Sequence, residues 1–168
     1  MDKIIETPRL RIRQFTKDDA SFIYQLLNDP SFIENIGDKK IKNNADAIQF
    51  LEQGPFASYR NRGFGFNLVA LKSTDQAIGM CGLVKRDELE NPDLGYAYLS
   101  AFQGLGFATE AASAILTELS NSKRLKSVSA IASPANTASN QVIIKTGFKF
   151  QQVIQFKGED ANLYTYSP

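Results

Sequence analysis

Apolar and polar positions alternate at the start of the chain and then take up a helical spacing. In residues 7–15, Leu10 and Ile12 alternate with arginines, a pattern that predicts a half-buried strand. Residues 20–27 place apolar side chains on one face of a helix, and Asn28-Asp29-Pro30 supplies a stop. The chain therefore begins with a strand followed by a short amphipathic helix.

The remaining sequence carries further segments of both kinds. A second helix is predicted at about 45–59, with a break or kink at Gly54-Pro55. Turn residues separate the three strand patterns that follow it, which predicts an antiparallel meander. The later elements are strands at 66–71, 77–84, 94–99, 127–132, 148–156 and 162–166 and helices at 108–119 and 137–146. These segments predict one mixed α+β domain over residues 1–168.

Composition and charge narrow the class of protein. A chain of 168 residues that is 43% hydrophobic can bury a core. Its 19 Lys and Arg nearly balance 18 Asp and Glu, so neither a nucleic acid nor an anionic membrane is indicated as a partner. Residues 1–6 are charged where a signal peptide is apolar, no apolar stretch approaches membrane-spanning length, and Cys81 is the only cysteine. We expect a cytoplasmic protein.

The sequence contains no histidine, which removes several mechanisms at once. Nucleophilic systems that pair serine or cysteine with histidine are excluded. Zinc sites built from imidazole are excluded too, and one cysteine cannot replace them, so no metal is expected. Proton transfer must use a carboxylate, a hydroxyl, a lysine, a terminus or water.

A glycine-containing loop opens the alanine-rich helix predicted at 108–119. Gly104 and Gly106 allow a tight turn and a close approach of the backbone to a ligand. The helix that follows presents free N–H groups and the positive end of its dipole, which together favour a phosphate or pyrophosphate. The alternative is that the two glycines only make a turn.

Two common nucleotide motifs do not fit this loop. A dinucleotide fingerprint needs Gly or Ala where Thr109 stands and an acidic residue about twenty positions later, where this chain has Lys123-Arg124-Leu125-Lys126. A phosphate loop of the NTPase kind needs Gly-Lys-Ser or Gly-Lys-Thr, which does not occur.

The loop is similar to the acetyl-CoA loop of the GNAT acyltransferase superfamily, with Gln103, Gly106 and Ala108 at its three characteristic positions. The resemblance extends over about residues 7–152 and is most specific to the RimJ/RimL-like branch, the ribosomal-protein N-terminal acetyltransferases. The other matching motifs are Thr7-Pro8-Arg9-Leu10, Asn28-Asp29-Pro30, Leu94-Gly95-Tyr96, Ala108-Thr109-Glu110-Ala111, Asn136-x-x-Ser139 and Lys145-Thr146-Gly147-Phe148. The resemblance implies the GNAT fold: a mostly antiparallel, splayed sheet of about seven strands flanked by about four helices.

The resemblance also implies where acetyl-CoA binds. The pantetheine arm lies between the family's splayed fourth and fifth strands, which places it on the backbone of Tyr98, Leu99 and Ser100. Asn136 is implied to contact the same arm, although asparagine is also a favoured helix N-cap. The pyrophosphate loop corresponds to Gln103, Gly104, Leu105, Gly106, Phe107, Ala108 and Thr109.

The catalytic residues are less clearly marked. Many GNAT enzymes carry a tyrosine acid where this chain has Ile143, so Ser139 is the nearest candidate by motif to protonate the departing thiolate. Ser139 could instead be a small packed helix residue, which would leave water as the acid. Asp93 is a candidate base but also fits an ordinary turn, and Glu110 fits a favourable first-turn charge. Cys81 lies in an apolar strand and is expected to be a core residue.

The expected reaction is direct transfer of the acetyl group to an amine. An α-amino group needs only about 1 kcal/mol to become neutral at pH 7, whereas a lysine needs about 4 to 5 kcal/mol. A site without histidine or an obvious base therefore suits a protein or peptide terminus, such as a ribosomal-protein N-terminus. Polyamines, amino acids and aminoglycosides stay open as acceptors, as does a non-catalytic acetyl-CoA-binding module. Both a monomer and a homodimer are compatible with the sequence.

Overall fold

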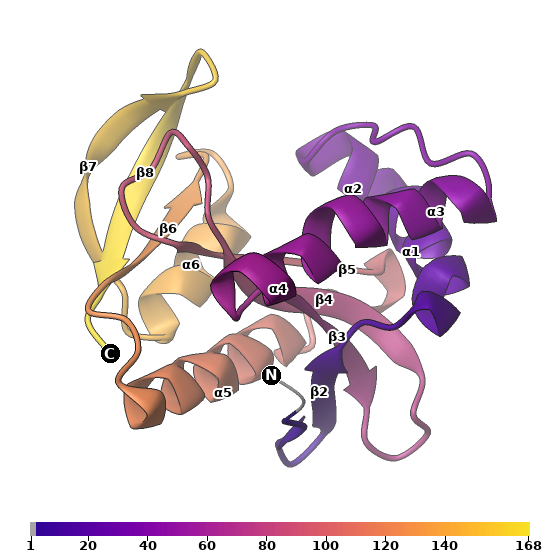
Figure 1. Cartoon of the computed structure of the whole chain (residues 1–168). Coiled ribbons are helices and arrows are strands. Elements are labelled where there is room, and N and C mark those ends of the chain that lie inside the picture. Colours follow the sequence, from indigo (N-terminus) through magenta and orange to yellow (C-terminus); the bar gives the residue numbers. More distant parts are fainter. Residues whose placement is uncertain (1–2) are drawn as a thin grey trace.

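One mixed sheet runs through the computed structural model, which describes residues 3–168, and helices cover both of its faces (Figure 1). The strand order is β1-β2-β3-β4-β5-β6-β8-β7, and every neighbouring pair is antiparallel except β5 and β6. The strands are β1 (Ile5–Glu6), β2 (Leu10–Gln14), β3 (Phe66–Leu71), β4 (Ala77–Val84), β5 (Asp93–Tyr98), β6 (Val128–Ala132), β7 (Lys149–Phe156) and β8 (Glu159–Tyr166).

The helices divide between the two faces of this sheet. Their bounds are α1 (Ala20–Leu27), α2 (Pro30–Asn35), α3 (Asn44–Leu51), α4 (Ala57–Arg62), α5 (Phe107–Ser122) and α6 (Thr137–Lys145). Helices α1 and α3 pack on side chains such as Leu68 and Met80, whereas α5 and α6 pack on the opposite face with Val69 and Cys81. Because side chains of a strand alternate between faces, neighbouring residues such as Leu68 and Val69 enter different cores.

The predicted fold is confirmed, with a few additional elements. The sheet is mixed and mostly antiparallel, and β3 and β4 have the predicted bounds. It has eight strands where about seven were expected, because β1 is a two-residue strand too short for its alternation to be read. There are also more α-helices than the four expected, because short helices flank the predicted ones.

Helix α2 was missed because its first residues looked like a stop signal. The Asp29 side chain accepts a hydrogen bond from the Ser31 N–H at 3.0 Å and caps the helix. Pro30 occupies the first turn, where its missing N–H costs no hydrogen bond. The same three residues therefore end α1 and begin α2.

The expected break at Gly54-Pro55 is a π-helical turn. Residues Glu52–Phe56 join α3 to α4 through this turn, with Pro55 inside it. A wider i to i+5 turn tolerates a residue that has no N–H, so the chain stays helical through the proline. Gly63, in the left-handed conformation, then ends α4.

Strands β5 and β6 meet at one point and then diverge. The parallel pairing is confined to Asp93 and Ser129, where the Ser129 N–H donates to the Pro92 carbonyl at 2.8 Å. Beyond this point β5 pairs only with β4, and β6 pairs only with β8. The predicted splay is therefore present, and it leaves one edge of β5 unpaired.

Candidate active site

The unpaired edge of β5 presents backbone groups to the gap. The Leu99 N–H donates to the Ile78 carbonyl of β4 at 2.9 Å. Since backbone direction alternates in an antiparallel pair, the N–H and carbonyl groups of Tyr96 and Tyr98 turn away from β4 and toward the gap. The Tyr98 carbonyl is already bonded to Gln103 Nε2 at 3.0 Å. The Tyr98 N–H and both Tyr96 groups line the gap.

The next two residues have their backbone groups directed elsewhere. The Leu99 carbonyl accepts from the Phe102 N–H at 2.9 Å, so both polar groups of Leu99 are bonded within the protein. The Ser100 N–H donates to Asp29 Oδ2 at 3.0 Å, and the Ser100 hydroxyl also donates to Asp29. Partial burial raises the pKa of Asp29, but the hydrogen bonds from Ser100 and Ser31 together lower it by more, so the pKa lies below its ordinary value. Coenzyme contacts at Leu99 and Ser100 stay predictions, and Tyr98 is the better placed of the three.

The loop before α5 collects several free donors. Gly104 and Gly106 have φ of +73° and +84°, in the left-handed region that favours glycine. Gly106 is the N-cap of α5, and its carbonyl accepts from the Glu110 N–H at 3.1 Å. No carbonyl within residues 3–168 accepts from the N–H groups of Gly104, Leu105, Gly106, Phe107, Ala108 and Thr109. Consecutive free N–H groups at the start of a helix form an anion-binding cradle.

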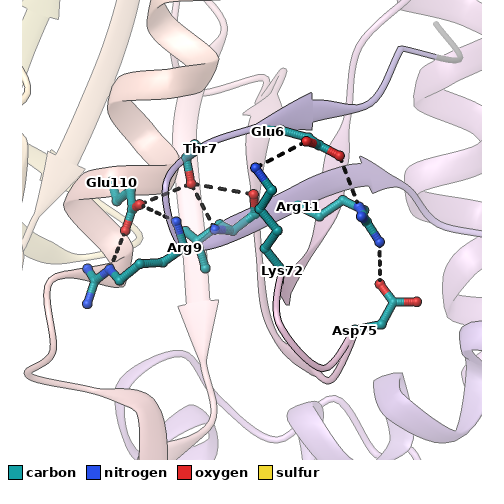
Figure 2. A network of polar contacts seen from close by, with 8 residues as sticks. Glu6, Thr7, Arg9, Arg11, Lys72, Asp75 and Glu110 are labelled. Atoms are coloured by element: carbon teal, nitrogen blue, oxygen red, sulfur yellow. Dashed lines mark hydrogen bonds and ion pairs between the residues drawn. The ribbon is translucent and has the colours of Figure 1, made fainter.

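Arg9, just before strand β2, contacts this loop and the first turn of α5, and Figure 2 shows its pairing with Glu110. Arg9 Nε pairs with Glu110 Oε2 at 2.7 Å, and Arg9 Nη1 donates to the Leu105 carbonyl at 2.9 Å. Glu110 Oε1 also accepts from the Arg9 N–H and from the Thr7 hydroxyl. The Arg9 guanidinium lies 4.2 Å from the centre of the Phe107 ring. Glu110 thus connects the N-terminal segment to the first turn of α5.

Both residues of this ion pair stand in motifs that the sequence shows, but the sequence does not show that they contact each other. In the sequence, Thr7-Pro8-Arg9 and Ala108-Thr109-Glu110 are separate motifs, and Glu110 fits a favourable first-turn charge. Although partial burial raises the pKa of Glu110, the hydrogen bonds from Arg9 and Thr7 give it a net downward shift. Glu110 is therefore a charged structural partner, a role that only the fold reveals.

Asn136 caps α6. Its side-chain oxygen accepts from the Ser139 N–H at 3.1 Å, as expected of the N-cap alternative. Its predicted contact with the coenzyme arm stays a prediction, since the side-chain amide N–H₂ group is not used by this bond. The cap fixes the first turn of α6, which carries Ser139.

Ser139 lies beside a residue that the sequence did not single out. Its hydroxyl is 3.0 Å from the hydroxyl of Tyr96, which projects from β5. Burial raises the pKa of Tyr96, against the lowering effect of the hydrogen bond with Ser139. Tyr96 therefore keeps its proton near neutral pH and can donate to Ser139. The hydroxyl pair joins β5 to α6 across the splayed part of the sheet.

Asp93 lies on the other face of β5. Residues 93 and 96 have opposite parity along the strand, so their side chains point to opposite faces. The residue is fully buried, and its carboxylate contacts Arg86 Nε at 3.1 and 3.2 Å. Burial raises the pKa of Asp93 to about 6, against the opposing effect of Arg86. This geometry supports a structural role at the β5–β6 junction and gives no support to the predicted role as base.

A family model described as acetyltransferase (GNAT) domain matches residues 9–149. The chain belongs to the GNAT acetyltransferase family. Family membership makes it an acetyl-CoA-dependent acyltransferase, as the loop motif implied. The residues assigned to the coenzyme fit such a donor, because a splayed edge, a row of free N–H groups and a braced glycine loop suit a long molecule with a pyrophosphate.

The chain is also similar to known proteins in sequence and in fold. The uncharacterized protein YkkB of Bacillus subtilis is 29% identical over 155 residues, covering 89% of this chain and 87% of YkkB. A putative GnaT-family acetyltransferase of Bordetella pertussis has a similar structure, with a TM-score of 0.85, 19% identity and coverage of 98% and 99% of the two chains. RimL, a ribosomal L7/L12 alpha-N-protein acetyltransferase in complex with coenzyme A, gives a TM-score of 0.84 at 16% identity and 98% coverage of each chain.

Other features of this acetyltransferase concern nucleophiles, metals and membranes. Cys81 is fully buried, and burial raises its thiol pKa to about 12, so it is a core residue and not a nucleophile. Among residues 3–168, no three His, Cys, Asp or Glu side chains are grouped in a way that could hold a metal ion. None of the helices in that same part of the chain is both long enough and apolar enough to span a membrane.

Proposed function

We propose that this acetyltransferase modifies the N-terminal α-amino group of a protein or peptide, as a single-domain cytoplasmic enzyme of the RimJ/RimL-like branch. The observation that supports this acceptor is the make-up of the gap beside β5. The hydroxyls of Tyr96 and Ser139 lie 3.0 Å apart beside the unpaired edge of β5, whereas the predicted base, Asp93, is buried on the opposite face of the strand. An acceptor that is already partly neutral at pH 7 suits such a site. The similar fold of RimL is compatible with this choice.

In the proposed complex, acetyl-CoA lies along the unpaired edge of β5. Its pyrophosphate accepts hydrogen bonds from the loop N–H groups of residues 104–109, and its pantetheine arm bonds to the backbone of Tyr98 and Tyr96. Asn136 can reach the same arm through its free amide N–H groups. The positive charge of Arg9, held beside the loop by Glu110, adds to the attraction for a phosphate.

The chemical step requires no covalent enzyme intermediate. The neutral amine nitrogen attacks the thioester carbonyl carbon, a C–N bond forms, and backbone N–H groups of β5 stabilise the oxyanion. The C–S bond then breaks, and the thiolate takes a proton from the Ser139 hydroxyl. Tyr96 replaces that proton through the 3.0 Å hydrogen bond. The proton lost by the amine passes to water, and water returns a proton to Tyr96, so the enzyme ends in its starting state.

A pair of matched peptides tests the acceptor class. One peptide has a free N-terminus and no free lysine, and the other has an acetylated N-terminus and one free lysine. We expect transfer to the first, with kcat/KM rising with pH and levelling near pH 8, because an α-amino group has a pKa of about 7.7 to 8.0. Because the chain contains no histidine, no imidazole titrates in this pH range, and the rise in kcat/KM can be assigned to the acceptor amine.

Other outcomes would overturn parts of the proposal. Transfer to the lysine peptide alone, with a kcat/KM that is constant above pH 7, would mean that a base deprotonates the lysine and that the α-amino assignment is wrong. Transfer to spermidine, an amino acid or an aminoglycoside and to neither peptide would establish a small-molecule acceptor. Acetyl-CoA binding with no transfer to any amine would establish a non-catalytic binding module.

A further inference from the structure

A cavity lies beside the C-terminal half of α5. It has a volume of about 180 Å³ and is lined by the second half of α5, by residues of strands β1 to β4 and by the segment that follows α4. Its apolar walls include Phe64, Leu83, Ile115 and Leu119. The side-chain amides of Gln14 and Asn67, which lie opposite each other on β2 and β3, form a small polar part of the lining. A cavity of this kind suits a small molecule with an apolar body.

The charge at this cavity is positive. Of the charged residues that line it, Lys3 pairs with Glu118 at 2.7 Å, which neutralises both. Arg62 and Arg124 also line it, and neither forms an ion pair with any residue of the described chain. The Arg124 Nη1 atom lies 4.0 Å from the point where a Cβ on Gly63 would stand, so its guanidinium is next to the Arg62 segment. Two arginines on the lining of one cavity, neither of them in an ion pair within the described residues, favour a bound anion, above all a carboxylate.

The cavity is separate from the coenzyme loop. Helix α5 has 16 residues and is therefore about 24 Å long. The glycine loop precedes its first residue, whereas the cavity is lined by Ile115, Glu118, Leu119 and Ser122 in its second half. None of the residues assigned to acetyl-CoA lines the cavity.

We propose that this cavity is a second binding site, which takes a small carboxylate with a short apolar body. The apolar body contacts Phe64, Ile115 and Leu119, and the carboxylate pairs with Arg62 and Arg124. Because the site is at the opposite end of α5, its ligand binds together with acetyl-CoA and does not compete with it. The inference does not depend on the acceptor amine or on the reaction.

Hexanoate is a suitable probe, with 1-hexanol and hexylamine as controls of similar shape and different charge. We expect titration of the ¹⁵N-labelled protein with hexanoate to shift the amide signals of Ile115, Leu119 and Leu125 and to leave those of Gly104 and Gly106 in place. Hexanol should bind at least tenfold more weakly, and hexylamine should not bind. Saturating coenzyme A should leave the hexanoate affinity unchanged.

Variants of the exposed arginines separate the site from general surface charge. Arg62→Gln combined with Arg124→Gln should weaken hexanoate binding at least tenfold. Arg60→Gln, on the same helix α4 but outside the cavity lining, should leave it unchanged. Displacement of hexanoate by coenzyme A, equal binding of hexylamine, equal effects of the double variant and Arg60→Gln, or no shift at α5 would each overturn the proposal.

Discussion

Arg9 and Glu110 lie 101 positions apart in the sequence and form an ion pair of 2.7 Å beside the glycine loop. The same arginine holds the Leu105 carbonyl and stacks on Phe107, so one carboxylate fixes the group that braces the loop. The loop geometry therefore depends on the N-terminal segment as well as on its own glycines.

The first prediction concerns this brace. Glu110→Ala removes the partner of Arg9 and frees the loop, so acetyl-CoA affinity measured by calorimetry should fall about three- to tenfold, or roughly 1 kcal/mol. Glu118→Ala is the matched control, because Glu118 lies on the same helix and pairs with Lys3 at its other end. Equal losses in the two variants would show that the Arg9 contact has no specific role in coenzyme binding.

The second prediction concerns the hydroxyl pair of β5 and α6. Ser139→Ala should lower kcat by about 10²-fold or more with little change in coenzyme affinity, because the thiolate loses its acid. Tyr96→Phe should lower kcat about tenfold, since Ser139 then loses its proton donor. Steady-state kinetics with the free-terminus peptide measure both effects.

Tyr166→Phe is the control for Tyr96→Phe, because the Tyr166 hydroxyl lies 3.3 Å from that of Ser120 in a similar pair away from the gap. Normal turnover in Ser139→Ala would return Ser139 to a packing role and leave water as the acid. Normal turnover in Tyr96→Phe would remove Tyr96 alone from the mechanism.

The third prediction concerns Gly106. Gly106→Asp places a Cβ 3.3 Å from Arg9 Nη2, in a backbone conformation with φ of +84°, and adds a negative charge where a phosphate is proposed to bind. Acetyl-CoA affinity should fall at least tenfold in the folded variant. Gly158→Asp is the control for strain alone, because Gly158 has φ of +82° and open space around it in the β7–β8 turn. Unchanged affinity in Gly106→Asp would refute the pyrophosphate assignment.

The fourth prediction concerns the pH dependence of stability. The folded pKa of Asp93, about 6, is above its ordinary 3.8, so the folded state holds this proton more tightly than the unfolded chain does. The contribution of Asp93 to stability is therefore fully present below about pH 4 and is lost as the pH rises to about 6, by roughly 3 kcal/mol at most.

Asp93→Asn isolates this effect, since the variant keeps every other carboxyl group. The free energy of unfolding of the wild-type protein, relative to Asp93→Asn, should fall by about 2 to 3 kcal/mol between pH 4 and pH 7 in urea titrations. A relative stability that instead rises over this range would mean that the attraction of Arg86 outweighs the burial of the carboxylate.

The sequence predicted the long elements because the apolar positions in their patterns are the positions that the folded protein buries. Residues 77–84 form β4 as predicted, and the alanine-rich stripe of α5 packs in the core through Ala111 and Ala112. Helix α2 and strand β1 are too short for a periodicity, and they are fixed by a cap and by a partner strand. Local patterns therefore predicted the frame but not its shortest parts.

For the site, the sequence predicted the loop and Ser139 but not their supports. The brace from Arg9 and the hydroxyl of Tyr96 act across 101 and 43 positions, and no spacing rule relates residues that far apart. Asp93 shows what the sequence could not reveal about a candidate base. Its place before Leu94-Gly95-Tyr96 made it a candidate base by motif, and the alternation of side chains along β5 directs it into the core, where it contacts Arg86.

Because β5 and β6 pair at a single point, the sheet consists of two sets of continuously hydrogen-bonded strands. Continuous ladders hold β1 to β5 in one unit and β6 to β8 in the other, and only the Asp93–Ser129 pairing joins their edges. Local opening of the protein should therefore start between β5 and β6. The strands share no continuous row of hydrogen bonds there, so amide hydrogen exchange should be fastest at this place in the sheet. Acetyl-CoA bound between β5 and β6 contacts both parts of the sheet. Its binding is therefore expected to stabilise both parts and to make them unfold in one cooperative transition.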